Sequence, residues 1–252
     1  MRLIVHLVFP LRKVILTLVA IAMFFLILDS VAYFFSCLFA EDFIELVDIT
    51  LEGNLPTWFS STQLLFAGLC AYFIAKQRSV ENKKHKANSW FVIAGFFAYM
   101  GIDDASQLHE RVATITADVF LDSNAGFFLI DVVKDFPSYY WLVIVLPIFA
   151  ALGLFMLFFL LKEFETKEVM RLFLIGIGFY VAAVGLDYFD GIESYYDSIV
   201  EGTLLTFGDA RHISRAIEEF IEMVGTTFIV VAFLQHWQRI QLSSPSQSSY
   251  VG

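Results

Sequence analysis

Charge and cysteine are scarce in this sequence, and both shortages narrow the classes of protein it can belong to. Only 17% of the 252 residues are charged, whereas a soluble domain carries about 25%. The net charge is −10, so the chain lacks the basic stripe that nucleic-acid binding requires. Its two cysteines, Cys37 and Cys70, stand in apolar runs with no CxxC or Cys/His spacing. They indicate neither a disulfide framework nor a zinc finger.

Apolar residues are abundant instead. Hydrophobic residues make up 58% of the chain, including 29 phenylalanines, and the mean hydropathy is +0.72. A membrane-spanning helix needs about 20 mostly apolar residues. Six runs qualify: 14–39, 57–77, 89–108, 139–161, 171–190 and 216–238. We therefore predict an all-α membrane bundle of six transmembrane helices, forming one domain over residues 1–240, with a disordered cytoplasmic tail at 241–252.

Basic residues predict which ends of these helices face the cytoplasm, because Lys and Arg concentrate in cytoplasmic loops. Twelve of the sixteen Lys and Arg residues fall before the first run, after the second and fourth runs, or after the last run. They are Arg2, Arg12, Lys13, Lys76, Arg78, Lys83, Lys84, Lys86, Lys162, Lys167, Arg171 and Arg239. We therefore expect both termini in the cytoplasm and the chain in the lipid bilayer of a bacterial inner membrane.

Three segments on the opposite, outer side combine polar and apolar residues. Segment 41–53 reads EDFIELVDITLEG, with apolar residues among acids. This pattern predicts a short amphipathic helix lying at the membrane interface. Segment 112–138 contains Phe127–Ile130, and segment 191–215 contains Tyr195 and Tyr196. We expect these two segments to cap the bundle or to dip toward the bilayer.

Acidic residues gather where three of the predicted helices reach the outer side. The third run ends in GIDDASQLHER (101–111), the fifth in DYFDGIE (187–193), and the last begins with RHISRAIEEFIE (211–222). If the helix continues to residue 110, Asp103 and Glu110 lie within about 20° of each other around it. The polar residues of the last segment fall on one helix face. They are Arg211, His212, Arg215, Glu218, Glu219 and Glu222.

This constellation is strongly negative. It holds nine acids and three arginines, and nine minus three leaves six negative charges if all of them ionise. An unpaired buried carboxylate costs several kcal/mol, so acids within a membrane are paired, protonated, hydrated or bound to metal. Three interpretations follow: a metal site, a protonated or ion-conducting cavity, and a structural salt-bridge network with the arginines.

The metal interpretation is our leading hypothesis, because two histidines and several carboxylates suit iron, manganese or zinc. The predicted ligands of this divalent metal are Asp103, His109, Glu110, Asp187, Glu219 and Glu222. Glu218 or Asp190 is then the candidate general base. This hypothesis describes a hydrolase or oxidoreductase that acts on a lipid-like or small substrate at the outer leaflet. A proton- or cation-coupled transporter or channel, and an accessory subunit of a membrane complex, remain the alternatives.

Two motifs carry a resemblance. The acidic pair Asp103-Asp104 is followed after four residues by His109-Glu110, and Glu218-Glu219-x-x-Glu222 opens the last helix. This combination resembles a family of uncharacterised multipass bacterial membrane proteins, whose members tend to have Asp-Glu at the acidic pair. The resemblance covers the helical frame and implies no activity. The intramembrane CAAX-type proteases do not fit, because Met223 stands where their motif has arginine.

Overall fold

The computed structural model describes residues 10–108, 111–112, 114–116, 146–190, 195–196 and 200–243. These residues are largely helical and contain no strand. The long helices are α1 (Leu11–Phe34), α3 (Leu55–Val80), α4 (Lys84–Ser106), α8 (Leu146–Glu163), α9 (Lys167–Asp190) and α11 (Phe207–Ser243). Two short ones, η1 (Ser36–Leu38) and α2 (Glu41–Val47), follow α1. The all-α class is confirmed for this part of the chain, and each predicted apolar run falls mainly within one long helix.

Local sequence explains where several helices begin. Asn54 caps α3, since its side chain accepts a hydrogen bond from the backbone N–H of Thr57 (3.2 Å). At α11 the Thr206 hydroxyl accepts from the N–H of Asp209 (3.2 Å), and the Asp209 carboxylate accepts from the N–H of Thr206 (2.8 Å). This reciprocal capping box satisfies backbone donors that the first turn of a helix leaves unpaired. It starts α11 nine residues before the predicted run at 216–238.

Two predicted elements end earlier than expected. The amphipathic helix predicted over 41–53 stops at Val47. Asp48 then turns the chain, because its carboxylate accepts hydrogen bonds from the N–H (2.8 Å) and hydroxyl (2.7 Å) of Thr50. Helix α4 stops at Ser106, because Gln107 takes the left-handed conformation with a φ of 50°. The predicted helical register between Asp103 and Glu110 is therefore interrupted. Helix α11 continues to Ser243, past the predicted start of the tail at residue 241, and the rest of that segment lies outside the described residues.

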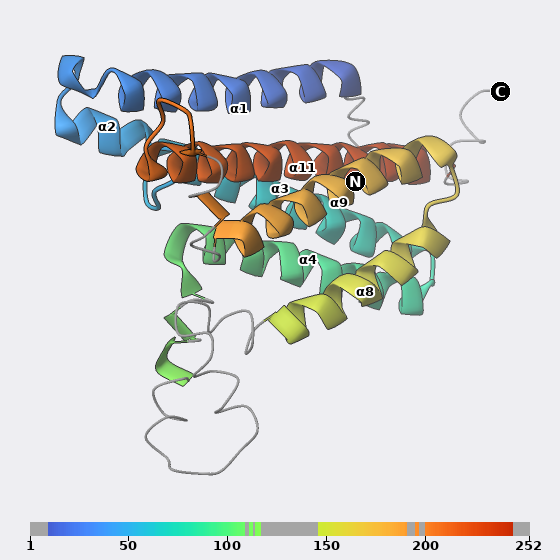
Figure 1. The fold of residues 1–252 in the computed structure, drawn as a ribbon. Helices are drawn as coiled ribbons and strands as arrows, with labels where there is room; N and C mark the ends of the chain where they lie inside the picture. The colour runs from blue at the N-terminus through green and yellow to red at the C-terminus, as the bar shows by residue number, and fades with distance from the viewer. Residues whose placement is uncertain are drawn as a thin grey trace, which may run out of the picture.

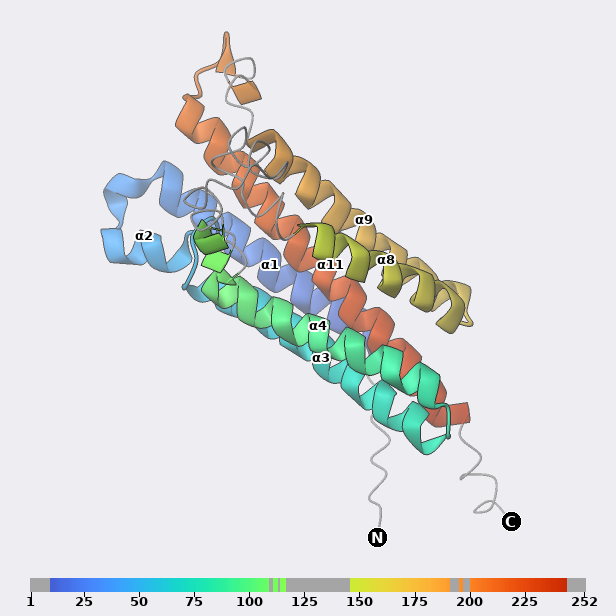
Figure 2. The same cartoon turned by 90° about the horizontal axis from the view of Figure 1, so that it is seen from below.

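Helix α11 is the centre of the bundle and packs against α1, α3 and α9 (Figure 1). The α3–α4 and α8–α9 connections, the start of α1 and the end of α11 share one end of the molecule (Figures 1 and 2). We call this the basic end, since it carries Arg78, Lys83, Lys86, Lys167 and Arg239. The opposite end holds α2 and the start of α11 (Figure 2). We call it the acidic end, after Asp104, Asp187, Glu218, Glu219 and Glu222.

Between the two ends lies a closely packed apolar layer. Trp90 is fully buried, and its ring packs edge-to-face against Phe233 of α11 with centroids 5.3 Å apart. Helices α9 and α11 approach closely at two glycines. A Cβ atom on Gly176 would lie 2.8 Å from the Gly225 carbonyl oxygen, a contact that no larger residue could make. These contacts fix how α9 and α11 face each other, and so position the glutamates of α11 that lie one to two turns before Gly225.

Among the described residues, three helices are long and apolar enough to cross a membrane: α1, α3 and α9. Length and composition thus support three spans directly rather than the six predicted. Asp103 and Asp104 in α4, and Glu218, Glu219 and Glu222 in α11, lower the hydropathy of those two helices. Only 11% of the apolar window of α1 is buried, compared with 61% for α3. Helix α1 therefore offers most of its apolar surface to its surroundings.

Candidate functional site

The acidic end is built on three glutamates of α11. Glu218 lies close to Asp187 of α9, and Glu222 is an electrostatic neighbour of Glu218, Asp187 and Asp104. Carboxylates from α4, α9 and α11 therefore converge, as the sequence predicted. All three glutamates are half-buried, and none forms an ion pair with a Lys or Arg within the described residues. Carboxyl groups thus accumulate on α11 without a directly bonded Lys or Arg among the described residues.

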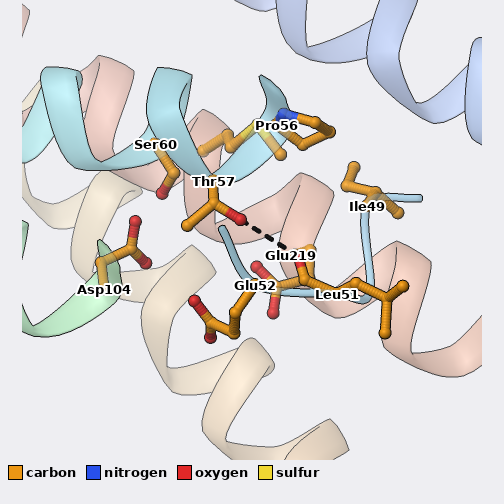
Figure 3. Close-up of a pocket in the computed structure, with 9 residues that line it drawn as sticks. Ile49, Leu51, Glu52, Pro56, Thr57, Ser60, Asp104 and Glu219 are labelled. Carbon is orange, nitrogen blue, oxygen red and sulfur yellow. Dashed lines mark hydrogen bonds between the residues drawn. The ribbon is translucent and has the colours of Figure 1, made fainter. Parts of the chain in front are cut away.

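A small cavity lies beside these glutamates (Figure 3). Its volume is about 10 Å³, roughly the room that one water molecule needs. The cavity is lined by three acids from different segments and by the hydroxyl residues of α3: Glu52, Asp104, Glu219, Thr57 and Ser60. Ser61 of α3 donates a hydrogen bond to the Asp104 carboxylate (2.7 Å). The cavity therefore offers a cluster of oxygen ligands to an occupant the size of one water or ion.

Asp104, rather than the predicted Asp103, reaches this cavity. Asp103 is buried (2% exposed) and accepts a hydrogen bond from Tyr99 of its own helix (3.4 Å). Successive residues of a helix point about 100° apart, so only one member of the acidic pair can face α3 and α11. Asp104 therefore lines the cavity, and Asp103 does not. The other predicted ligands of this segment, His109 and Glu110, lie outside the described residues.

Asp190, the second candidate general base, serves a different purpose. Its two carboxylate oxygens accept hydrogen bonds from Arg211 (3.1 and 3.0 Å), and one of them also accepts from the Tyr196 hydroxyl (3.1 Å). Such a bidentate pair fastens α9 to the start of α11. The carboxylate that accepts these bonds is poorly placed to accept a proton from a substrate. Glu218 remains the better candidate for that role.

His212 does not join the acidic cavity. Its Nε2 atom lies 3.1 Å from the carboxylate of Asp29 in α1. The Tyr33 ring stacks on the imidazole, with centroids 3.8 Å apart and planes at 8°. The polar stripe of α11 therefore splits. His212 and Glu219 face α1 and segment 48–54, whereas Arg211 and Glu218 face α9.

Sequence reasoning missed Glu52, which enters the cavity from the connection between α2 and α3 (Figure 3). The connection is held in place by Asn54, whose amide donates to the carbonyl oxygens of Asp48 (2.5 Å) and Glu45 (3.1 Å). The only signal for it was the acidic character of segment 41–53. A continuous helix through that segment would have placed Glu52 elsewhere.

A second ionic cluster at the basic end was also missed. Glu163 is buried at 1% exposure, and its carboxylate contacts Arg78 (2.6 Å) and Lys86 (2.8 Å). Burial raises the pKa of Glu163, but the bonds from His236 and Lys86 and the charge of Arg78 outweigh it and lower the pKa to about 2. His236 is buried and lies 3.5 Å from Glu163. A groove of about 580 Å³ opens beside Arg78 and His236.

Comparison with known proteins identifies one family. The family model described as a domain of unknown function (DUF8692) matches residues 12–237. No curated protein and no solved structure matches the chain. The match agrees with the expectation of an uncharacterised family and assigns no role to any of the residues above.

Proposed function

Since the chain belongs to the DUF8692 family, a domain family of unknown function, we propose its function from the geometry of its own residues. The protein is a multipass membrane protein that binds a divalent cation at its acidic end. The observation that carries this proposal is the meeting of Glu219, Asp104 and Glu52 around one small cavity, with Glu218 and Glu222 beside it.

The arrangement of the helices supports a six-span membrane bundle with both termini in the cytoplasm. The start of α1, the end of α11 and the α3–α4 connection lie together at the basic end (Figure 2). Lys and Arg concentrate on the cytoplasmic side of membrane proteins. The acidic end then faces the outside of an inner membrane. Apolar residues such as Phe24, Ile27 and Leu16 on the outer surface of α1 are 56–70% exposed, which suits contact with lipid.

The ligand atoms indicate which cations suit the cavity. Carboxylates and hydroxyls are hard oxygen donors, which favour Mg²⁺, Ca²⁺ and Mn²⁺. Without a histidine among the described lining residues, manganese is the best match among the iron, manganese and zinc expected from sequence. Glu219, Glu222 and Asp104 are the principal proposed ligands, and Asp187 supports the site through Glu218. In a hydrolase or oxidoreductase, Glu218 would serve as the base beside the ion.

Transport of protons or cations is the second candidate, and one observation favours it. A track of polar side chains continues from the acids toward the middle of the bundle. Tyr180 of α9 and Thr226 of α11 share a hydrogen bond (2.6 Å), and Gln63 of α3 donates to Thr227 (3.1 Å). Beyond Thr227 the apolar layer of Ile229 and Phe233 interrupts this track within the described residues. Transport would require this layer to open.

Cation binding is tested directly with purified full-length protein in detergent. Titration with Mn²⁺, followed by the loss of its free-ion EPR signal, is expected to show saturable binding. Glu219→Gln and Glu222→Gln should each weaken binding at the acidic end at least tenfold, since each removes a negative oxygen ligand. Glu41→Gln is the matched control, because Glu41 is an exposed acid of α2. Equal Mn²⁺ affinity in all four proteins would exclude the proposal.

Flux measurements separate transport from static binding. Proteoliposomes loaded with a pH- or Mn²⁺-sensitive dye are expected to show uptake only if the apolar layer opens during function. Uptake that is lost in Glu222→Gln supports the transport candidate. Binding without uptake supports a site that holds its ion, as a metalloenzyme or a structural subunit would.

A further inference from the structure

A second group of metal-ligand residues lies apart from the acidic cavity, and we infer that it is a site for a first-row divalent transition metal. The group consists of Asp29 in α1, Asp48 after α2, and His212 in α11. One ligand atom from each residue lies within 4.8 Å of the corresponding atom of the other two. The three residues come from separate segments, so the fold rather than the local sequence brings them together.

The distances suit coordination by a single ion. Imidazole nitrogen binds Zn²⁺ at about 2.0–2.1 Å and carboxylate oxygen at about 2.0–2.2 Å, which places ligand atoms of one ion about 3.3 Å apart. The His212 Nε2 and Asp29 Oδ2 atoms are 3.1 Å apart. Asp48 needs only a small side-chain movement to complete a three-ligand set. One imidazole with two carboxylates suits Zn²⁺, Mn²⁺ or Fe²⁺, with water in the remaining positions.

Neighbouring groups already orient the ligands, as the surroundings of metal sites do. The Tyr33 ring stacks on His212 and fixes the plane of the imidazole. The backbone N–H of Ile49 donates to Asp29 Oδ1 (3.2 Å), while Thr50 donates twice to Asp48. Each of the three side chains is thus held by a partner outside the set. The Ile49 N–H bond to Asp29 also brings the preceding residue, Asp48, beside the Asp29–His212 pair.

Charge around this group also favours a cation. Asp209 lies next to the set and accepts a hydrogen bond from the Tyr33 hydroxyl (3.1 Å). Three carboxylates therefore surround one imidazole. Within the described residues neither Asp29 nor Asp48 forms an ion pair with Lys or Arg, although Asp29 is 2% exposed. A divalent ion would balance this charge.

The site is independent of the proposed function, since it shares no carboxylate with the acidic cavity. The two sites also differ in a measurable way, because His212 gives this one a nitrogen ligand. Mn²⁺ bound here should show coupling to an imidazole nitrogen in pulsed EPR. Mn²⁺ bound among Glu219, Glu222 and Asp104 should show none from those ligands.

The test uses purified full-length protein and Mn²⁺ as the probe. Wild type is expected to show imidazole coupling, which Glu222→Gln retains. His212→Asn should lose the coupling, and Asp29→Asn should weaken binding of this ion at least tenfold. Tyr33→Phe keeps the stacked ring and should bind Mn²⁺ within about twofold of wild type. Elution of every variant at the wild-type volume in size-exclusion chromatography checks folding.

Two results would overturn the inference, and neither depends on a variant that fails to fold. The first is saturation of wild type with Mn²⁺ without any imidazole coupling. The second is undiminished coupling in His212→Asn, which would place the nitrogen ligand elsewhere. If Glu222→Gln loses the Mn²⁺ ion at the acidic cavity while the remaining Mn²⁺ ion keeps its imidazole coupling, the two sites are distinct and both are supported.

Discussion

Glu163 and Glu222 are glutamates of the same bundle, yet the fold surrounds them in opposite ways. Glu163, at the basic end, contacts Arg78, Lys86 and His236. Glu222, at the acidic end, is surrounded by the carboxylates of Glu218, Asp104 and Asp187. The first carboxylate has its counter-charges built into the chain. The second has hydroxyl groups and further acids around it, and no Lys or Arg of the described chain forms an ion pair with it.

The contrast separates a carboxylate that stabilises the fold from one that is suited to a ligand. A buried charge with its partners in place contributes to stability, because removing one partner leaves the others uncompensated. Like charges held close together destabilise the protein unless something from outside neutralises them. The basic end is therefore complete as folded, whereas the acidic end has the composition of a binding site.

The largest expected difference in stability is between the same Glu→Gln substitution made at the two ends. Glu163→Gln should lower the stability by about 3–5 kcal/mol, since Arg78 and Lys86 lose their buried counter-charge. Glu222→Gln should leave the stability unchanged or raise it by up to about 1 kcal/mol, because a repulsive charge is removed. Thermal unfolding of both variants by circular dichroism in one detergent measures the difference. Equal shifts of the melting temperature would show that the two ends do not differ in this way.

Low pH should remove the stabilisation that the Glu163 carboxylate contributes at the basic end. The pKa of Glu163 is about 2, below its ordinary 4.5, so the carboxylate stabilises the fold fully above pH 4.5. This contribution is lost as the pH falls toward 2 and the folded protein binds the proton. A pKa difference of about 2.5 corresponds to about 3 kcal/mol. The gap in melting temperature between wild type and Glu163→Gln should therefore stay constant from pH 6 to about pH 5 and narrow from there to pH 3.

The smallest expected loss of stability comes from breaking an exposed ion pair at the same basic end. Arg239 and Glu168 are 2.6 Å apart, with side chains 41% and 63% exposed. Water and salt screen such a pair, so Arg239→Gln should cost about 0–1 kcal/mol. The melting temperature of this variant, measured beside Glu163→Gln, tests whether burial rather than ion pairing matters. A loss as large as that of Glu163→Gln would mean that Arg239 belongs to the buried network.

The long apolar runs predicted the helical frame well, because a run of about 20 apolar residues has few other ways to satisfy its backbone. Rotation about each helix axis could not be predicted. Asp103 and Asp104 differ by one residue, and the packing of Gly101 against Ser61 and Leu65 of α3 decides which of them faces the cavity. Sequence alone offers no comparable information about a neighbouring helix.

Contacts between segments far apart in the sequence could not be predicted either. Arg78 and Glu163 are 85 residues apart, and a count of basic residues reads Arg78 only as a topology signal. His212 lay on the correct polar stripe, but its partner is Asp29, 183 residues away. The place of Glu52 in the cavity could not be predicted, because it depends on a turn at Asp48 that the acidic pattern of 41–53 does not indicate.

Helix α11 runs without interruption from Phe207 to Ser243, so one continuous helix connects the acidic end to the basic end. Glu222 and His236 lie on this helix about 21 Å apart, at 1.5 Å per residue. A tilt or translation of α11 that moves Glu222 toward a bound ion must also displace His236 beside Glu163, unless the helix bends at Gly225. Filling of the proposed site at the acidic end would therefore be transmitted to the basic end through this one helix.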